Sequence, residues 1–113
     1  MHKKGDFNME PITNNANKVL CCFYKEFLER RKLNMSIRDS SRFTYEFFSS
    51  DKLFSKWHKS DIDTNLMELG NKKYISAYIG SQFQLTNEAI IYLENRFQNG
   101  AKEVIDLISK FIP

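Results

Sequence analysis

The sequence has few of the residues that mark several protein classes. Only two cysteines, two prolines and four glycines occur among 113 residues, which excludes collagen-like and linker-like chains. Ten phenylalanines and five tyrosines are too many for a disordered chain. No apolar run approaches the roughly 18–20 residues of a membrane-spanning helix. We therefore expect one globular domain with a core of its own.

The two cysteines, Cys21 and Cys22, are neighbours in the sequence. Adjacent cysteines rarely form a disulfide because the ring is strained, so two buried thiols in a helix are expected. His2 and His58 are the only histidines and no Cys-x-x-Cys pair occurs, so we expect no metal site. Signatures such as GxSxG, a P-loop, GxGxxG and HExxH are also missing. We expect neither an enzyme nor a bound cofactor.

The first eleven residues lack periodicity and predict a flexible arm ahead of a domain over residues 12–113. Two early lysines are not followed by an apolar run, so the segment is unlike a secretory signal. A cytoplasmic protein with no membrane partner is expected.

Apolar spacing predicts a long helix over residues 15–32. Ala16, Leu20 and Phe23 recur at three- and four-residue intervals. Thr13, or one of the two asparagines after it, could cap the first turn.

Shorter helices are predicted in the next part of the chain. Ser36 is placed to cap a helix over residues 37–44, and a further helical turn is expected over residues 51–58. Trp57, at the end of that turn, could fill the core or stack on a nucleic-acid base. Ser60 repeats the capping signal and predicts a third helix over residues 61–71.

A β-hairpin is predicted where β-branched and aromatic residues flank Gly80. A loop over residues 80–82 places Ile79 opposite Phe83 and gathers apolar residues on one face, whereas a two-residue loop mixes the faces. The preferred register turns two aromatic residues outward as interface candidates: Tyr74 and Tyr78.

Two more helices are predicted after the hairpin. Thr86 is placed to cap a helix over residues 87–97, and a last helix covers residues 101–112. The apolar face of the last helix is wide, so it packs across the first helix or meets a second subunit. Candidate contacts of a dimer are Val104, Leu107, Ile108 and Phe111.

This order of elements predicts a mainly α fold with a small β-hairpin (α+β), as in a winged helix-turn-helix with an extra C-terminal helix. The segment DIDTNLMELGNKKYI resembles the step from the third helix into the wing of winged helices, and FQLTNEAIIYLENRF resembles the step that leaves the wing. With the closing GAKEVIDLISKFIP, residues 12–113 are similar to small YjcQ-like winged-helix proteins of Gram-positive bacteria and their phages. Fold alone does not imply function.

Charge is unevenly distributed along the chain. Residues 18–42 carry seven cations against three carboxylates, whereas residues 60–72 carry three carboxylates against one lysine. Phosphates would repel an acidic third helix deep in a DNA groove, so contacts to the DNA backbone are expected from the first two helices. The alternative, a solvated face on which cations balance nearby acids, stays open. The candidate phosphate contacts are Lys18, Lys25, Arg30, Arg31, Lys32, Arg38 and Arg42. On and after the third helix, the candidates for contacts to DNA are Thr64, Asn65, Asn71, Lys72 and Lys73.

Two functions are compatible with these patterns. The first is a small winged-helix DNA-binding protein, such as a phage or mobile-element regulator, with double-stranded DNA as its partner. The second is a protein-interaction winged helix, either a homodimer or a phage-encoded effector that binds a host protein, without sequence-specific DNA binding. The acidic third helix, the outward tyrosines and the broad last helix motivate this alternative.

Overall fold

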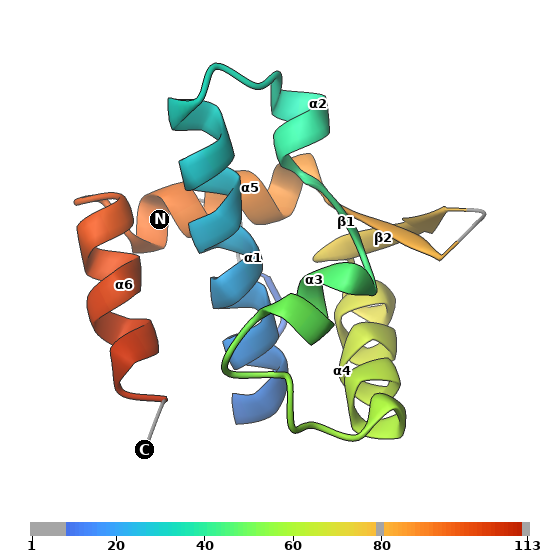
Figure 1. Ribbon diagram of the computed structural model, residues 1–113. Helices are drawn as coiled ribbons and strands as arrows, with labels where there is room; N and C mark the ends of the chain where they lie inside the picture. The colour runs from blue at the N-terminus through green and yellow to red at the C-terminus, as the bar shows by residue number, and fades with distance from the viewer. Residues whose placement is uncertain (1–8, 79–80, 112–113) are drawn as a thin grey trace.

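Helices pack beside a small antiparallel sheet whose strands β2 and β3 extend from one side of the molecule (Figure 1), which is the mainly α class with few strands that the sequence predicts. The computed structural model describes residues 9–78 and 81–111. In these ranges the elements are, in order, α1 (Asn14–Lys32), α2 (Ile37–Ser40), β1 (Arg42–Thr44), α3 (Glu46–Ser50), α4 (Lys59–Asn71), β2 (Ile75–Tyr78), β3 (Gln82–Leu85), α5 (Asn87–Arg96) and α6 (Ala101–Ser109). Strand β3 lies in the middle of the sheet, in the order β1-β3-β2.

Helix α1 runs through the core because its apolar residues recur every three or four positions. Thr13 accepts a hydrogen bond from the backbone N–H of Ala16 (3.3 Å), one of the caps that the sequence allows. Cys21 and Cys22 are buried free thiols, as predicted. Burial raises the pKa of Cys21 to about 11 and also raises that of Cys22, which keeps both thiols protonated and unreactive.

The predicted helix over residues 37–44 is wrong in its second half. Ser36 does cap α2, since its Oγ accepts a hydrogen bond from the Asp39 N–H (3.0 Å). The helix is only one turn long, and strand β1 follows. Phe43 is buried there between less buried neighbours, which is the alternation of a strand. Because β1 is stabilised by pairing with β3, far along the chain, local spacing could not reveal it.

The helical turn expected over residues 51–58 is also wrong, because α3 comes earlier and turns follow it. Asp51 ends α3, and its Oδ1 accepts a hydrogen bond from the Leu53 N–H (2.8 Å). Phe54 is buried, and the Trp57 ring packs edge-on against it with centroids 4.9 Å apart. The structure thus favours the packing role that was considered for Trp57.

Helix α4 starts at Lys59, earlier than predicted, so Ser60 lies inside the helix and is not its cap. His58 takes the cap position without a side-chain hydrogen bond. Lys73, after the helix, has a positive φ of 69°. This left-handed residue turns the chain from α4 into β2.

The hairpin is paired two residues away from the predicted register. Ala77 faces Phe83, whereas the prediction places Ile79 opposite Phe83. A slip of two residues keeps every side chain on its own face, so Phe83 and Leu85 are buried as expected. Ile79, predicted in the strand, and Gly80, predicted in the loop, lie outside the described residues.

Tyr74 is buried, so the prediction that it points outward from the hairpin is wrong. Only 1% of its surface is exposed. Its hydroxyl donates a hydrogen bond to the backbone carbonyl of Glu10, and its ring meets that of Tyr92 edge-on at 5.8 Å. The segment before α1 and helix α5 thus cover this residue. The side chain of Tyr78 lies outside the described residues.

Helix α5 follows the prediction closely. Thr86 caps it by accepting a hydrogen bond from the Ala89 N–H (3.1 Å). After the helix, Gly100 has a φ of 72°, a conformation that glycine adopts without steric cost. The chain turns there into α6.

Helix α6 packs on α1, the first of the two positions considered for it (Figure 1). Val104 is fully buried and Ile108 is 8% exposed. Leu107 and Phe111 are half buried against the same core. The prediction of a dimer interface is therefore corrected for Val104 and Ile108, which are buried in the single chain, whereas Leu107 and Phe111 stay candidates for such an interface. The predicted last residue of the helix, residue 112, lies outside the described residues.

The residues just before α1 are tied to the end of α4. Thr13 donates hydrogen bonds from its N–H and its Oγ1 to the Glu68 carboxylate (2.7 and 2.8 Å). The Lys72 ammonium donates to the carbonyl of Pro11. Of the predicted arm, Glu10 and Pro11 thus accept hydrogen bonds from Tyr74 and Lys72, and residues 1–8 lie outside the described residues.

Candidate nucleic-acid interface

Helix α4 exposes one side to solvent. Its apolar residues Ile62, Leu66 and Leu69 are buried, and the helix packs on α1. The exposed side carries residues at three- and four-residue spacing, which we call the outer stripe: Ser60, Thr64, Met67 and Asn71. Small polar side chains around one thioether are suited to contacts with base edges in a DNA groove.

Asp63 of α4 is engaged within the fold. Its carboxylate accepts a hydrogen bond from the Tyr45 hydroxyl (2.5 Å) and one from the Lys59 ammonium (3.0 Å). The Lys59 ammonium also lies over the Tyr45 ring, 4.5 Å from its centroid. The hydrogen bond from Tyr45, and then that from Lys59, lowers the pKa of Asp63 below its ordinary value. The negative charge of Asp63 is therefore balanced locally.

Glu68 of α4 is also engaged, since it accepts both hydrogen bonds from Thr13. Asp61 is the third carboxylate of the helix, and it is exposed. Of the three carboxylates of α4, Asp63 is therefore balanced by a cation, whereas Glu68 and Asp61 keep their negative charges, with Glu68 turned toward Thr13.

A cavity of about 450 Å³ opens between the first turns of α1 and α4, with Lys18, Lys56 and His58 in its lining. Figure 1 shows both helices beginning at the same end of the molecule. The amino ends of two helices and two lysines favour an anion such as a phosphate group, whereas the Asp61 carboxylate, which also lines the cavity, opposes one. Lys18 is half buried, and its ammonium lies over the Phe111 ring, 5.6 Å from the centroid.

Lysines also flank the other end of α4. Lys72 follows the helix and is half buried, and Lys73 is exposed. The outer stripe thus has lysines near both ends. Lys59 pairs with Asp63 and Lys72 donates to the Pro11 carbonyl, so Lys56 and Lys73 are the lysines that can contact phosphates. The sequence pattern did not single out Lys56 and Lys59. A net charge summed over a range of residues does not show where each lysine lies relative to the exposed side of α4.

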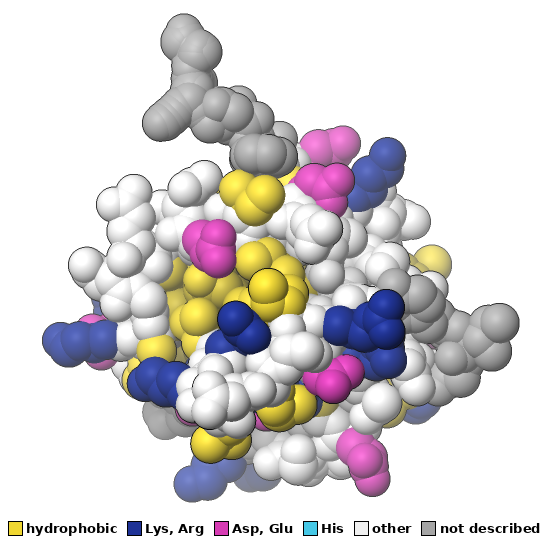
Figure 2. All heavy atoms as spheres, turned by 90° about the horizontal axis from the view of Figure 1, so that it is seen from above, with side chains coloured by type: hydrophobic (Ala, Val, Ile, Leu, Met, Phe, Trp, Pro, Cys, Tyr) yellow, Lys and Arg dark blue, Asp and Glu magenta, His cyan; other side chains and the backbone are white. Residues whose placement is uncertain are grey.

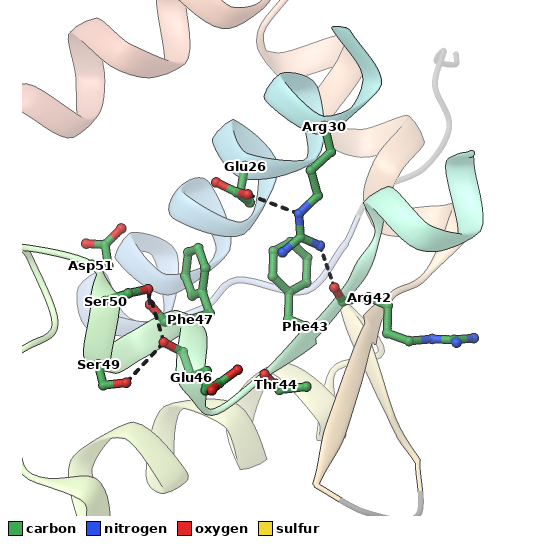
Figure 3. Close-up of a pocket in the computed structure, with 10 residues that line it drawn as sticks. All are labelled: Glu26, Arg30, Arg42, Phe43, Thr44, Glu46, Phe47, Ser49, Ser50 and Asp51. Atoms are coloured by element: carbon green, nitrogen blue, oxygen red, sulfur yellow. Dashed lines mark hydrogen bonds and ion pairs between the residues drawn. The ribbon is translucent and has the colours of Figure 1, made fainter. Parts of the chain in front are cut away.

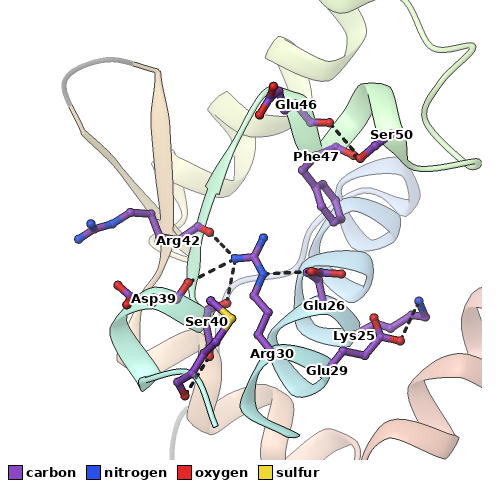
Figure 4. Close-up of polar contacts among 11 residues, drawn as sticks. Lys25, Glu26, Glu29, Arg30, Asp39, Ser40, Arg42, Glu46, Phe47 and Ser50 are labelled. Atoms are coloured by element: carbon purple, nitrogen blue, oxygen red, sulfur yellow. Dashed lines mark hydrogen bonds and ion pairs between the residues drawn. The ribbon is translucent and has the colours of Figure 1, made fainter. Parts of the chain in front are cut away.

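Arg30 is part of the internal structure rather than a phosphate contact, which corrects its predicted role (Figure 4). Its Nε donates to the Glu26 carboxylate (3.0 Å), and its Nη1 donates to the Arg42 carbonyl (2.6 Å). Longer bonds reach the carbonyls of the α2 segment, including that of Ser40 at 3.4 Å. The guanidinium covers the Phe43 ring at 4.6 Å from its centroid. Arg30 therefore connects α1 to the segment that leads into β1.

The other predicted cations of residues 18–42 do not make one basic face. Lys25 pairs with Glu29 (3.3 Å), and Arg31 donates to the carbonyl of Met35 (2.7 Å). In Figure 4 the Arg42 side chain points away from Arg30. Lys25 and Arg30 thus fit the alternative in which cations balance nearby acids. The rest are exposed or half buried: Lys32, Arg38 and Arg42.

Asn65 is buried, although the sequence predicts that it is exposed and contacts DNA. It is 6% exposed, and its Nδ2 donates to the Asp61 carbonyl of the preceding turn (2.8 Å). The prediction of a base contact is therefore wrong for Asn65. Thr64 is exposed, and its Oγ1 donates to the Ser60 carbonyl (2.9 Å). Asn71 is exposed at the end of the outer stripe.

A second cavity, of about 540 Å³, lies between α1, β1 and α3 (Figure 3). The carboxylates of Glu26, Glu46 and Asp51 surround it, and the rings of Phe43 and Phe47 line it. Carboxylates repel phosphate. Arg30 and Arg42 also line the cavity, so its lining holds one more carboxylate than it holds arginines.

No known protein family, no curated protein and no solved structure matches this chain. In the described part of the chain, no group of three or more His, Cys, Asp or Glu residues is arranged to hold a metal ion. None of the helices in the described ranges is long and apolar enough to cross a membrane.

Proposed function

We propose that the chain is a winged-helix protein that binds double-stranded DNA, with α4 in the major groove and the β2–β3 hairpin as the wing beside it. The order of elements supports this proposal, because helices lead into a hairpin whose strand β3 also pairs with β1. The quoted resemblance to YjcQ-like winged-helix proteins points the same way. In helix-turn-helix proteins a recognition helix enters the major groove.

The observation that carries the proposal is the outer stripe of α4 with lysines at both of its ends. Lysines there contact phosphates and position the protein, whereas the polar stripe faces the bases. Lys59 balances the charge of Asp63, and the Glu68 carboxylate is turned toward Thr13 rather than along the outer stripe. This placement differs from the backbone contacts that the sequence predicts for the first two helices.

Fluorescence anisotropy with a labelled duplex of mixed sequence tests the proposal. At about 50 mM salt we expect binding in the micromolar range that weakens steeply as salt is added, with a log–log slope of about −0.9 for each phosphate contacted. Absence of binding at that salt concentration contradicts the proposal.

Lysine variants then locate the interface. Lys56→Gln and Lys73→Gln should each weaken binding to every sequence alike and reduce the salt slope by about 1. Lys102→Gln, an exposed lysine of α6, is the matched control and should change neither quantity. If the control weakens binding as much as the two α4-flanking variants, DNA does not bind at α4.

A second candidate function is binding to a protein through the α1–α2 turn. Leu33 is 77% exposed and Ile37 is 54% exposed there. Figure 2 shows this end of the molecule, where hydrophobic side chains gather in the middle of the face with both basic (Lys, Arg) and acidic (Asp, Glu) side chains around them. Exposed apolar groups within a charged rim are common at protein interfaces. Light scattering of the pure chain tests self-association, and Leu33→Asp with Ile37→Asp should abolish it.

A further inference from the structure

We infer that α4 selects A·T base pairs in the major groove, through Met67 and Asn71 of the outer stripe. The inference rests on the proposed DNA-binding function and adds the class of sequence that the protein prefers. The inference is based on the polar and apolar groups that the exposed side of α4 can present to base edges, and on the absence of arginine among them.

Helix α4 lacks the side chain that reads guanine best. Arginine and lysine bind the O6 and N7 atoms of guanine in the major groove. No arginine occurs in α4, and its one lysine, Lys59, pairs with Asp63 beside Tyr45. Contacts to G·C pairs from the outer stripe are therefore weak.

Asn71 offers the complementary group for adenine. An asparagine amide can donate to N7 and accept from N6 of the same adenine, a pair of bonds that no other base matches in the major groove. The Asn71 side chain is exposed and makes no hydrogen bond with the described part of the chain. Its amide is therefore free to meet a base. Asn65 cannot do the same, because it is buried and bonded to the Asp61 carbonyl.

Met67 offers an apolar contact for the thymine methyl group. It is 67% exposed in the middle of a polar stripe. Thr64, one turn earlier, donates its hydroxyl to the Ser60 carbonyl, which leaves its methyl group as a second apolar contact. The C5-methyl of thymine is the one apolar group at the major-groove edge of the four base pairs.

The spacing of these side chains suits neighbouring base pairs. Met67 and Asn71 are four residues apart, which is about 6 Å along a helix axis. Base pairs are about 3.4 Å apart along DNA, so the two side chains reach adjacent or next-adjacent pairs. Asp61, in the first turn, can accept from the amino group of either cytosine or adenine and so does not define a preference at its own position.

Selection of binding sequences from a duplex pool with a random core tests the inference. The pure chain should enrich A·T pairs at two neighbouring positions, with affinity about tenfold or more above a matched G·C duplex. Asn71→Ala should remove the preference at one position and Met67→Ala at the other, with little change in binding to the unselected pool. Asn95→Ala, an exposed asparagine of α5, and Leu33→Ala are the matched controls and should leave both preferences intact.

A duplex with inosine·cytosine pairs separates the two grooves. Such pairs keep the major-groove edge of G·C and remove the guanine amino group from the minor groove. The selected duplex should lose affinity when these pairs replace its A·T pairs. Unchanged affinity would place the readout in the minor groove and overturn the inference.

The remaining outcomes are distinct from one another. Equal binding to A·T and G·C duplexes, or enrichment of G·C at the two positions, overturns the inference and leaves DNA binding in place. Absence of binding to every duplex at low salt removes the proposed function and the inference together. Circular dichroism of each variant verifies that the fold is retained.

Discussion

Replacement of Arg30 by alanine should remove the main polar connection between α1 and the α2–β1 segment. The side chain donates to the Arg42 carbonyl at 2.6 Å, a charge-assisted hydrogen bond that contributes about 2 kcal/mol. Its pair with Glu26 is partly exposed and adds about 0.4 kcal/mol. Its contact with the Phe43 ring, 4.6 Å from the centroid, adds about 0.7 kcal/mol. The free energy of unfolding should therefore fall by about 3 kcal/mol, out of the 5–15 kcal/mol typical of a domain.

Urea denaturation followed by tryptophan fluorescence measures this loss. Trp57 is the only tryptophan and packs edge-on against Phe54, so its emission reports unfolding of the core next to α3. A loss of about 3 kcal/mol lowers the midpoint by roughly 2 M urea for a small domain. Arg31→Ala is the matched control, since Arg31 makes one exposed hydrogen bond to Met35, and its cost should be about 0.5 kcal/mol. Equal midpoints for Arg30→Ala and Arg31→Ala would refute the structural role of Arg30.

Three other predictions follow from side chains in or near the core. The pKa of Asp63 is lowered in the folded chain, so the stability that its charged form contributes is present above the pKa of the unfolded chain and is lost as the pH falls through the folded pKa. Tyr45→Phe should therefore destabilise the protein more at pH 7 than at pH 3. Equal losses in urea titrations at the two pH values would contradict this. Cys21 and Cys22 should resist a thiol reagent at pH 8 in the native chain and react once urea unfolds it; rapid reaction without urea would show that the thiols are accessible. Val104→Asp should unfold the chain, with loss of its far-ultraviolet circular dichroism, because the substitution places a carboxylate at a fully buried site. A variant that stays folded and is monomeric would instead support the dimer interface.

The elements that the sequence predicts well are those whose stability is local. Helices α1 and α5 carry repeated apolar spacing, and Thr13 and Thr86 cap them through bonds to residues three positions away. Strand β1 has only three residues, too few to show a period, and it exists because Phe43 reaches the core while β3 pairs with its backbone. A short strand of this kind cannot be separated from a helix end by local pattern alone.

The candidate site on α4 could also be predicted only in part from local sequence patterns. The sequence predicts the exposed position of Thr64 but places Asn65 on the same surface, because a one-residue difference decides which side of a helix faces α1. The surroundings of the α4 carboxylates are set by residues far from the helix in the chain, since Tyr45 and Thr13 donate hydrogen bonds to Asp63 and Glu68. A net charge summed along the chain contains none of this information.

The sequence by itself therefore determined helices α1, α4, α5 and α6, the hairpin, and the caps of α1, α2 and α5, because these depend on periodicity and on neighbours within a few residues. Only the tertiary structure decided that Arg30 is internal, that Tyr74 is buried and that α6 covers α1. Each of these depends on contacts between segments that are far apart in the sequence. Such contacts bury or expose a side chain without changing the local pattern around it, which is why the position of every charge around α4 had to come from the fold.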